Sequence, residues 1–183
     1  MLLALVVSLL ASAAADVPLH GQYGILKDKL EYVFQVPPTK VEGVLFLAHG
    51  CSHSATDWWP TSDSCPKCIG LPVERAVVRE ALNRSYLVVA LSSSDRSSKC
   101  WSKRDLPFAG QVIDHLYSTV LDSQWTIPLH LFGASSGGGF VGLFGKRGSL
   151  TRPVVASVCI QIMGLRSYSN MPPSLFMLMS KVC

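Results

Sequence analysis

The sequence predicts an α/β protein, a three-layer αβα sandwich around a mostly parallel β-sheet. Its apolar residues gather in several nearly continuous runs of strand length, and strands of this kind are buried on both faces, as in parallel sheets. Segments with helical periodicity separate these runs, which indicates βαβ units. The chain has 183 residues, of which 49% are hydrophobic and 15% charged, so one globular domain with its own core is expected.

Four apolar, β-branched runs are predicted to be the central strands. They are "VLFLAHG" from Val44, "YLVVALSSS" from Tyr86, "LHLFG" from Leu129 and "VVASVCIQIMG" from Val154. A weaker run, "EYVFQVP" from Glu31, is predicted to precede them as an outer strand, and "SLFMLM" from Ser174 to follow them as one more.

Amphipathic patterns predict helices between these strands. The segment "LPVERAVVREALNRS" has a proline near its first helical position and a glutamate in its first turn, as helix N-termini prefer. Its predicted buried face consists of Val73, Ala76, Val77 and Ala81. A second helix is predicted from about Leu106, with apolar residues at spacings of three and four. They are Ala109, Val112, Ile113, Leu116, Tyr117 and Val120.

Residues 1–15, "MLLALVVSLLASAAA", predict a signal peptide because a compact apolar run ends in small residues. Residues 16–183 are then the mature chain, a single domain. The run falls short of the roughly 20 apolar residues of a spanning helix, so membrane contact is expected only through an uncleaved leader. Asn83 opens the glycosylation sequon Asn-Arg-Ser, which a chain in the secretory pathway can use. We therefore expect a secreted protein or one in the secretory lumen.

The charge pattern does not favour a nucleic-acid partner. The formal net charge is +4, and the basic residues between the second central strand and the second helix are bracketed by acidic ones. These residues are Asp95, Arg96, Lys99, Lys103, Arg104 and Asp105. We interpret this segment as a solvated loop, and no nucleic acid is expected to bind.

One short motif carries the strongest functional signal. Residues 133–137, "GASSG", match G-x-S-x-G between a predicted strand and a helix that should begin near Gly138. In this motif a sharp turn exposes a nucleophilic serine, and the turn needs small residues two positions before and after it. Ser135 has glycine at both positions, Gly133 and Gly137, so it is the favoured nucleophile. A shift of one residue to the following serine stays open.

The same glycines also match parts of nucleotide-binding motifs. Gly137, Gly139 and Gly142 spell G-x-G-x-x-G, but that motif expects an acidic residue roughly 20 positions on, and no Asp or Glu follows Asp122. A phosphate-binding loop around Lys146 lacks its first glycine and its Ser or Thr. We therefore expect no cofactor.

Together these motifs resemble the α/β-hydrolase fold superfamily over about residues 31–180. The likeness rests on "LFLAHGCSH", followed by a strand, a helix and then "LFGASSGG". It implies a serine esterase or lipase type of activity on a small ester or acyl substrate, with Ser135 as the nucleophile. The wider stretches "HGCSHSATDWW" and "CPKCIGLPVER" look like predicted secreted hydrolase-like proteins of plants.

The resemblance also implies an oxyanion hole, which stabilises the negative charge that develops on the substrate during acyl transfer. His49 and Gly50 occupy the position of the family's oxyanion loop. One donor would be the backbone N–H of Ser136, and the other would be that of Cys51 or Ser52.

The residues that should activate the serine are missing from their usual place. The family orders its triad as Ser, acid, His, but no acid or histidine follows Ser135. The sequence stops after a segment that looks like the strand preceding the family's acid. We therefore expect a C-terminally truncated hydrolase fold that lacks its last strands and helix and is catalytically incomplete. A rearranged site that uses His49 or His53, with Asp57, and a non-catalytic binding or regulatory module are the alternatives.

Six cysteines suit a secreted chain. Cys51, Cys65, Cys68 and Cys100 fall in loops at one predicted sheet edge, so two disulfides are expected among them, with a structural zinc site as the alternative. Cys159 is predicted to be a free thiol inside a strand. We expect no metal.

Three tryptophans, Trp58, Trp59 and Trp101, are predicted at the same rim. They fit an acyl pocket or ordinary packing equally well.

Overall fold

The computed structural model describes residues 16–27, 29–146, 154–160 and 171–177, so the predicted leader and Cys183 lie outside the described residues. The described strands are β1 (Gln22–Leu26), β2 (Leu30–Gln35), β3 (Gly43–Ala48), β4 (Tyr86–Leu91), β5 (Leu129–Ala134), β6 (Val154–Ile160) and β7 (Ser174–Met177). The described helices are η1 (Ala55–Asp57), α1 (Pro72–Asn83), η2 (Lys103–Asp105), α2 (Leu106–Thr119) and α3 (Ser136–Lys146).

These strands form a single sheet in the order β1-β2-β4-β3-β5-β6-β7. The pairs from β4 to β7 are parallel, whereas β1 pairs with β2 and β2 with β4 in antiparallel fashion. The predicted mostly parallel sheet is thus confirmed, with an antiparallel edge. Strand β1 was not predicted from the sequence. In its five residues, QYGIL, only the C-terminal end is strongly apolar, and the strand forms through backbone pairing with β2.

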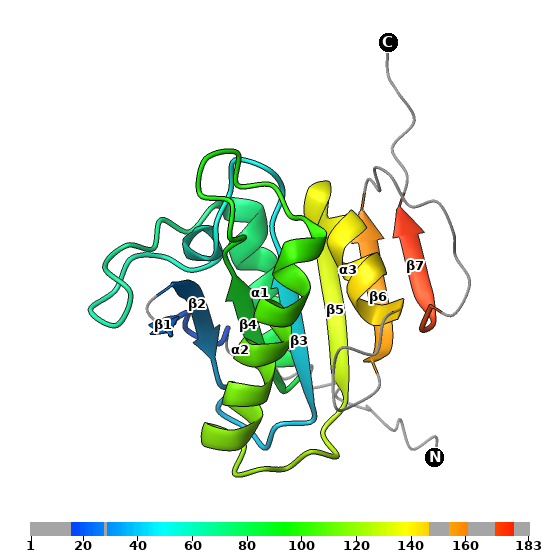
Figure 1. Ribbon diagram of the computed structural model, residues 1–183. Helices are drawn as coiled ribbons and strands as arrows, with labels where there is room; N and C mark the ends of the chain where they lie inside the picture. Colours follow the sequence, from blue (N-terminus) through cyan, green and yellow to red (C-terminus); the bar gives the residue numbers. More distant parts are fainter. Residues whose placement is uncertain (1–15, 28, 147–153, 161–170, 178–183) are drawn as a thin grey trace, which may run out of the picture.

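Helices cover both faces of the sheet, which confirms the three-layer architecture (Figure 1). On one face, α2 and α3 pack over the strands around Phe46, and every residue of the predicted α2 face from Ala109 to Tyr117 is buried. On the other face, α1 packs against β4. The carboxyl ends of β3, β4 and β5 therefore meet at one edge, where ligand sites of such sheets lie.

The predicted buried face of α1 was wrong in part. The helix buries Val78, Ala81 and Leu82, while Val73 is 71% exposed. Valines and alanines lie on two adjacent stripes of this helix, so periodicity alone could not select the stripe that faces the sheet. The stripe of α1 that does not pack on the sheet instead lines an apolar groove of about 520 Å³ beside Phe132.

Two disulfides join the four rim cysteines, Cys51 to Cys100 and Cys65 to Cys68. The prediction of two disulfides is confirmed, and these bonds are compatible with a secreted protein. The thiol of Cys159, like that of Cys183, lies outside the described side chains. No helix in the described part of the chain is long and apolar enough to cross a membrane.

Candidate active site

Ser135 lies on the sharp turn between β5 and α3. Its φ of 53° falls in the left-handed region, which costs a non-glycine residue about 1–2 kcal/mol. A Cβ at Gly133 would lie 2.3 Å from the carbonyl oxygen of Gly137, and one at Gly137 would lie 2.2 Å from that of Ala48. Both flanking positions therefore require glycine, because backbone atoms occupy the space of a side chain.

Ser136, the alternative nucleophile, is the first residue of α3 rather than the strained turn residue. The helix thus begins two residues before the predicted Gly138, and the Gly139 N–H already bonds to the Ser135 carbonyl at 3.1 Å. The Ser136 backbone N–H belongs to the first helical turn, whose N–H groups have no partner inside the helix. Ser136 is thus a helix N-terminal residue, while Ser135 has the left-handed backbone conformation of the turn.

The loop after β3 approaches Ser135 closely. A Cβ built on Gly50 would lie 3.6 Å from the Cβ of Ser135, and Cys51 is anchored by its disulfide to Cys100. The N–H of Ser52 donates to the Ser98 carbonyl at 3.1 Å, so it is not a free oxyanion donor. Among the described residues, the N–H of Cys51 has no hydrogen-bond partner. Of the two backbone N–H groups that the sequence left open as the second oxyanion donor, only that of Cys51 is unpaired within the described residues.

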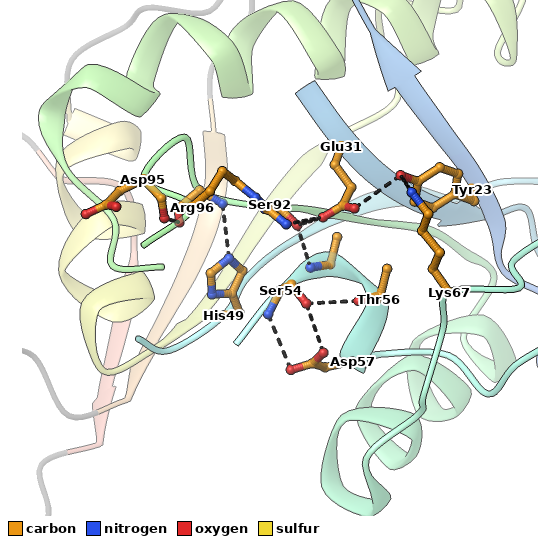
Figure 2. A network of polar contacts seen from close by, with 12 residues as sticks. Tyr23, Glu31, His49, Ser54, Thr56, Asp57, Lys67, Ser92, Asp95 and Arg96 are labelled. Atoms are coloured by element: carbon orange, nitrogen blue, oxygen red, sulfur yellow. Dashed lines mark hydrogen bonds and ion pairs between the residues drawn. The ribbon is translucent and has the colours of Figure 1, made fainter. Parts of the chain in front are cut away.

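His49 connects the ends of β3 and β4 and is 2% exposed. Its Nδ1 donates to the Gly50 carbonyl at 2.6 Å, and its Nε2 accepts the Ser93 N–H at 3.1 Å, as Figure 2 shows for Nε2. Burial lowers the pKa of His49 to about 4, so the ring is neutral near pH 7. Because both ring nitrogens are occupied by backbone groups, His49 shapes the loop and has no atom left for proton transfer.

A polar network that the sequence did not reveal lies behind this loop (Figure 2). Glu31 on β2 accepts hydrogen bonds from Ser92 at 2.6 Å, Arg96 at 2.9 Å and Tyr23 at 3.1 Å. Burial alone would raise the pKa of Glu31, but the Ser92 bond and the charge of Arg96 outweigh it and hold that pKa below its usual value. Ser92 also accepts the Ala55 N–H, so this carboxylate ties β2 and β4 to η1.

His53 and Asp57, the last residue of η1, form a hydrogen bond with 2.8 Å between Nδ1 and Oδ2. Asp57 is 6% exposed, and its carboxylate also accepts the Ser54 N–H at 3.3 Å and the Ser54 hydroxyl at 3.0 Å. The last two contacts are drawn in Figure 2. The His53 side chain is 42% exposed, so it is partly open to solvent.

A cavity of about 190 Å³ opens beside Ser135. It is lined by Cys51, Trp101, Ser102, Ser135, Ser136, Gly139, Phe140 and Leu143. Trp101 stacks on Phe140 with 4.3 Å between ring centroids, so it forms an apolar wall. Trp58 and Trp59 are instead core residues of the opposite face, and the indole N–H of Trp59 donates to Gln35.

The charged loop between β4 and α2 is held by internal contacts. Asp105 accepts hydrogen bonds from the N–H groups of Ser94 and Ser102, both at 2.7 Å, and Asp95 accepts one from the hydroxyl of Ser98.

The four cysteines at this edge of the sheet all form disulfides, and no three metal-ligating side chains meet within the described ranges. Asn83 is exposed at the end of α1.

Comparison with solved structures identifies the fold class. A monoglyceride lipase variant from Saccharomyces cerevisiae matches with a TM-score of 0.55 at 16% identity, over 80% of this chain and 46% of its own. The siderophore hydrolase EstB from Aspergillus fumigatus matches at 0.56 and 11%, over 80% and 44%. A predicted CIB-like hydrolase from Thermoplasma acidophilum matches at 0.53 and 17%, over 86% and 72%.

These likenesses show that the chain has the α/β-hydrolase fold. It spans less than half the length of the yeast and Aspergillus proteins. No protein-family model and no curated protein sequence matches this chain.

Proposed function

We propose that this protein is a serine hydrolase of the esterase or lipase type, with Ser135 as its nucleophile. The observation that carries the proposal is the positive φ of a non-glycine serine at the strand-to-helix turn, clamped between two glycines whose Cβ positions are filled by backbone. Such strain persists only where the surrounding structure enforces it, and it gathers at active sites. Solved hydrolases of the same fold support the class.

In this proposal the backbone N–H groups of Ser136 and Cys51 stabilise the oxyanion that forms when Ser135 attacks an acyl carbon. Loss of one such donor in comparable sites costs about 2.7–4 kcal/mol of transition-state stabilisation. The disulfide to Cys100 supports the second donor, since it fixes the loop that carries it.

The proposed substrate is a small ester or acyl compound. The cavity of about 190 Å³ beside Ser135 has an apolar wall of Trp101, Phe140 and Leu143. It is smaller than the roughly 300–1,000 Å³ of pockets that hold drug-sized ligands. These dimensions support a short acyl group rather than a long fatty-acyl chain.

A fluorophosphonate probe tests the nucleophile directly. Ser135 Oγ should displace the fluoride and form a stable phosphonyl ester, which mass spectrometry of the labelled peptide would place on Ser135 and not on Ser136. Ser135→Ala should abolish labelling and the hydrolysis of a p-nitrophenyl butyrate substrate. The control Ser118→Ala, an exposed serine on α2, should label like the wild type. A folded wild type that takes no label would instead support a non-catalytic binding or regulatory module.

We further propose that the chain is secreted after removal of residues 1–15. The two disulfides support an oxidising compartment, and the sequon at the exposed Asn83 gives an independent readout. In a eukaryotic secretion host, the medium should contain a chain that begins at Asp16 and shifts in mass after glycosidase treatment, whereas Asn83→Gln should show no shift. Retention inside the cell with an intact leader would contradict the proposal.

A further inference from the structure

We infer that His53 is the general base for Ser135 and that Asp57 is the residue that positions it. The inference rests on the proposed function and supplies the proton acceptor that a serine nucleophile needs. The described part of the chain holds five histidines that are candidates for this base. All five histidines precede Ser135.

The structure removes four of these histidines from consideration. His49 has both ring nitrogens bonded to backbone groups. His130 lies at the start of β5, at the sheet edge opposite the elbow, where its ring packs against Tyr86. His115 is on α2 with its ring against Tyr32, and His20 is exposed in the segment before β1.

His53 has the arrangement that a general base requires. Asp57 binds its Nδ1 at 2.8 Å, which leaves Nε2 as the free nitrogen, as in a Ser-His-Asp triad. Asp57 is itself fixed by the N–H and hydroxyl of Ser54, so the ring orientation is set by a buried carboxylate rather than by solvent. Within the described ranges, Nε2 of His53 has no hydrogen-bond partner.

The loop also brings His53 next to the nucleophile. A Cβ at Gly50 would lie 3.6 Å from the Ser135 Cβ and 3.7 Å from the His53 Cδ2, the carbon bonded to Nε2. The two side chains thus flank the space above Gly50.

A strained turn holds His53 in this place. The His53 N–H bonds to the Gly50 carbonyl at 3.3 Å, and Ser52 at the third position of the turn has a φ of 68°, where glycine is usual. Two external restraints maintain the strain: the bond from the Ser52 N–H to Ser98 and the disulfide of Cys51. Strain enforced from outside is typical of functional loops.

The proposed step balances as follows. His53 Nε2 accepts the Ser135 Oγ proton while Oγ bonds to the acyl carbon and the carbonyl electron pair moves onto oxygen. The imidazolium then gives the proton to the ester oxygen as that bond breaks, which yields an alcohol and acyl-Ser135. Water repeats the sequence with His53 as base, releases the carboxylic acid and regenerates the serine.

The test uses the full chain and the rates of fluorophosphonate labelling and of p-nitrophenyl butyrate hydrolysis. His53→Gln should lower both by about 100-fold or more, the usual contribution of a general base. Asp57→Asn should lower them by a similar factor, and Asp57→Glu should restore part of the loss. The matched control His20→Gln should be unchanged. Added imidazole should restore hydrolysis in His53→Ala but not in Ser135→Ala, a rescue that a structural role would not produce.

Two negative outcomes separate the inference from the proposed function. If wild type is labelled at Ser135 and His53→Gln is labelled within twofold of it, His53 is not the base although Ser135 remains the nucleophile. If the folded wild type is not labelled at all, both proposals fail. Because the His53 side chain is 42% exposed, His53→Gln should keep the wild-type melting temperature even if Asp57→Asn does not fold.

Discussion

Replacing Gly137 with alanine is expected to lower the free energy of unfolding by about 3 kcal/mol or more, which is the upper range for overpacking. A Cβ at this position would lie 2.2 Å from the carbonyl oxygen of Ala48 and 2.4 Å from that of His49. The end of β3 cannot retreat easily, because Ala48 is in register with both Leu91 and Gly133 in the sheet. Either the elbow or the sheet must therefore distort.

Urea unfolding followed by far-UV circular dichroism measures this loss. Gly145→Ala is the matched control, since it lies in the same helix and the nearest atoms to its new Cβ are side-chain atoms, those of Pro172 at 3.1 and 3.2 Å and of Leu131 at 3.6 Å. The free energy of unfolding of this control should stay within about 1 kcal/mol of the wild-type value. Alanine stabilises a helix interior relative to glycine by about that amount. Equal stability of Gly137→Ala and wild type would refute the close packing at the elbow.

Removal of the Cys51–Cys100 disulfide by replacing both cysteines with alanine should cost about 4 kcal/mol. The bond closes a loop of 49 residues, and its loss returns that conformational freedom to the unfolded chain. The melting temperature should fall by about 10 °C for a chain of this size. Labelling of Ser135 should also decrease, because Cys51 lines the cavity and carries the proposed oxyanion donor.

The second disulfide provides the comparison. Cys65 and Cys68 are only three residues apart, so the same chain-entropy argument gives about 2 kcal/mol for their double alanine variant. Differential scanning calorimetry of the two variants should show the larger decrease for the long loop, with Ser135 labelling retained in the short-loop variant. A larger decrease for Cys65 and Cys68 would mean that local packing, and not loop closure, dominates.

Much of the fold follows from hydrophobic patterning. The central strands and both amphipathic helices were predicted because each buries a continuous run or a regular stripe, and burial of that kind is recorded locally in the sequence. Strand β1 and the buried stripe of α1 were not predicted correctly. The first depends on backbone pairing with a partner, and the second on a choice between two equally apolar stripes.

The candidate site, like the fold, was predicted from the sequence only in part. The turn around Ser135 was predicted because its flanking glycines are adjacent in sequence and mark a close backbone approach. The sequence treated His49 and His53 as equal candidates for a rearranged base. Only the contacts separated them, since backbone groups occupy both nitrogens of His49 while Asp57 binds one nitrogen of His53.

The sequence by itself determined the α/β class, the place of the serine elbow and the four cysteines of the rim, because each depends on residues that are near neighbours along the chain. The tertiary structure decided which cysteines pair, which backbone N–H of the loop after β3 is already bonded and which histidine lies across Gly50 from Ser135. These features join the ends of β3, β4 and β5, which are far apart in sequence. Their distances are fixed only when the parallel sheet brings the three strand ends to one edge.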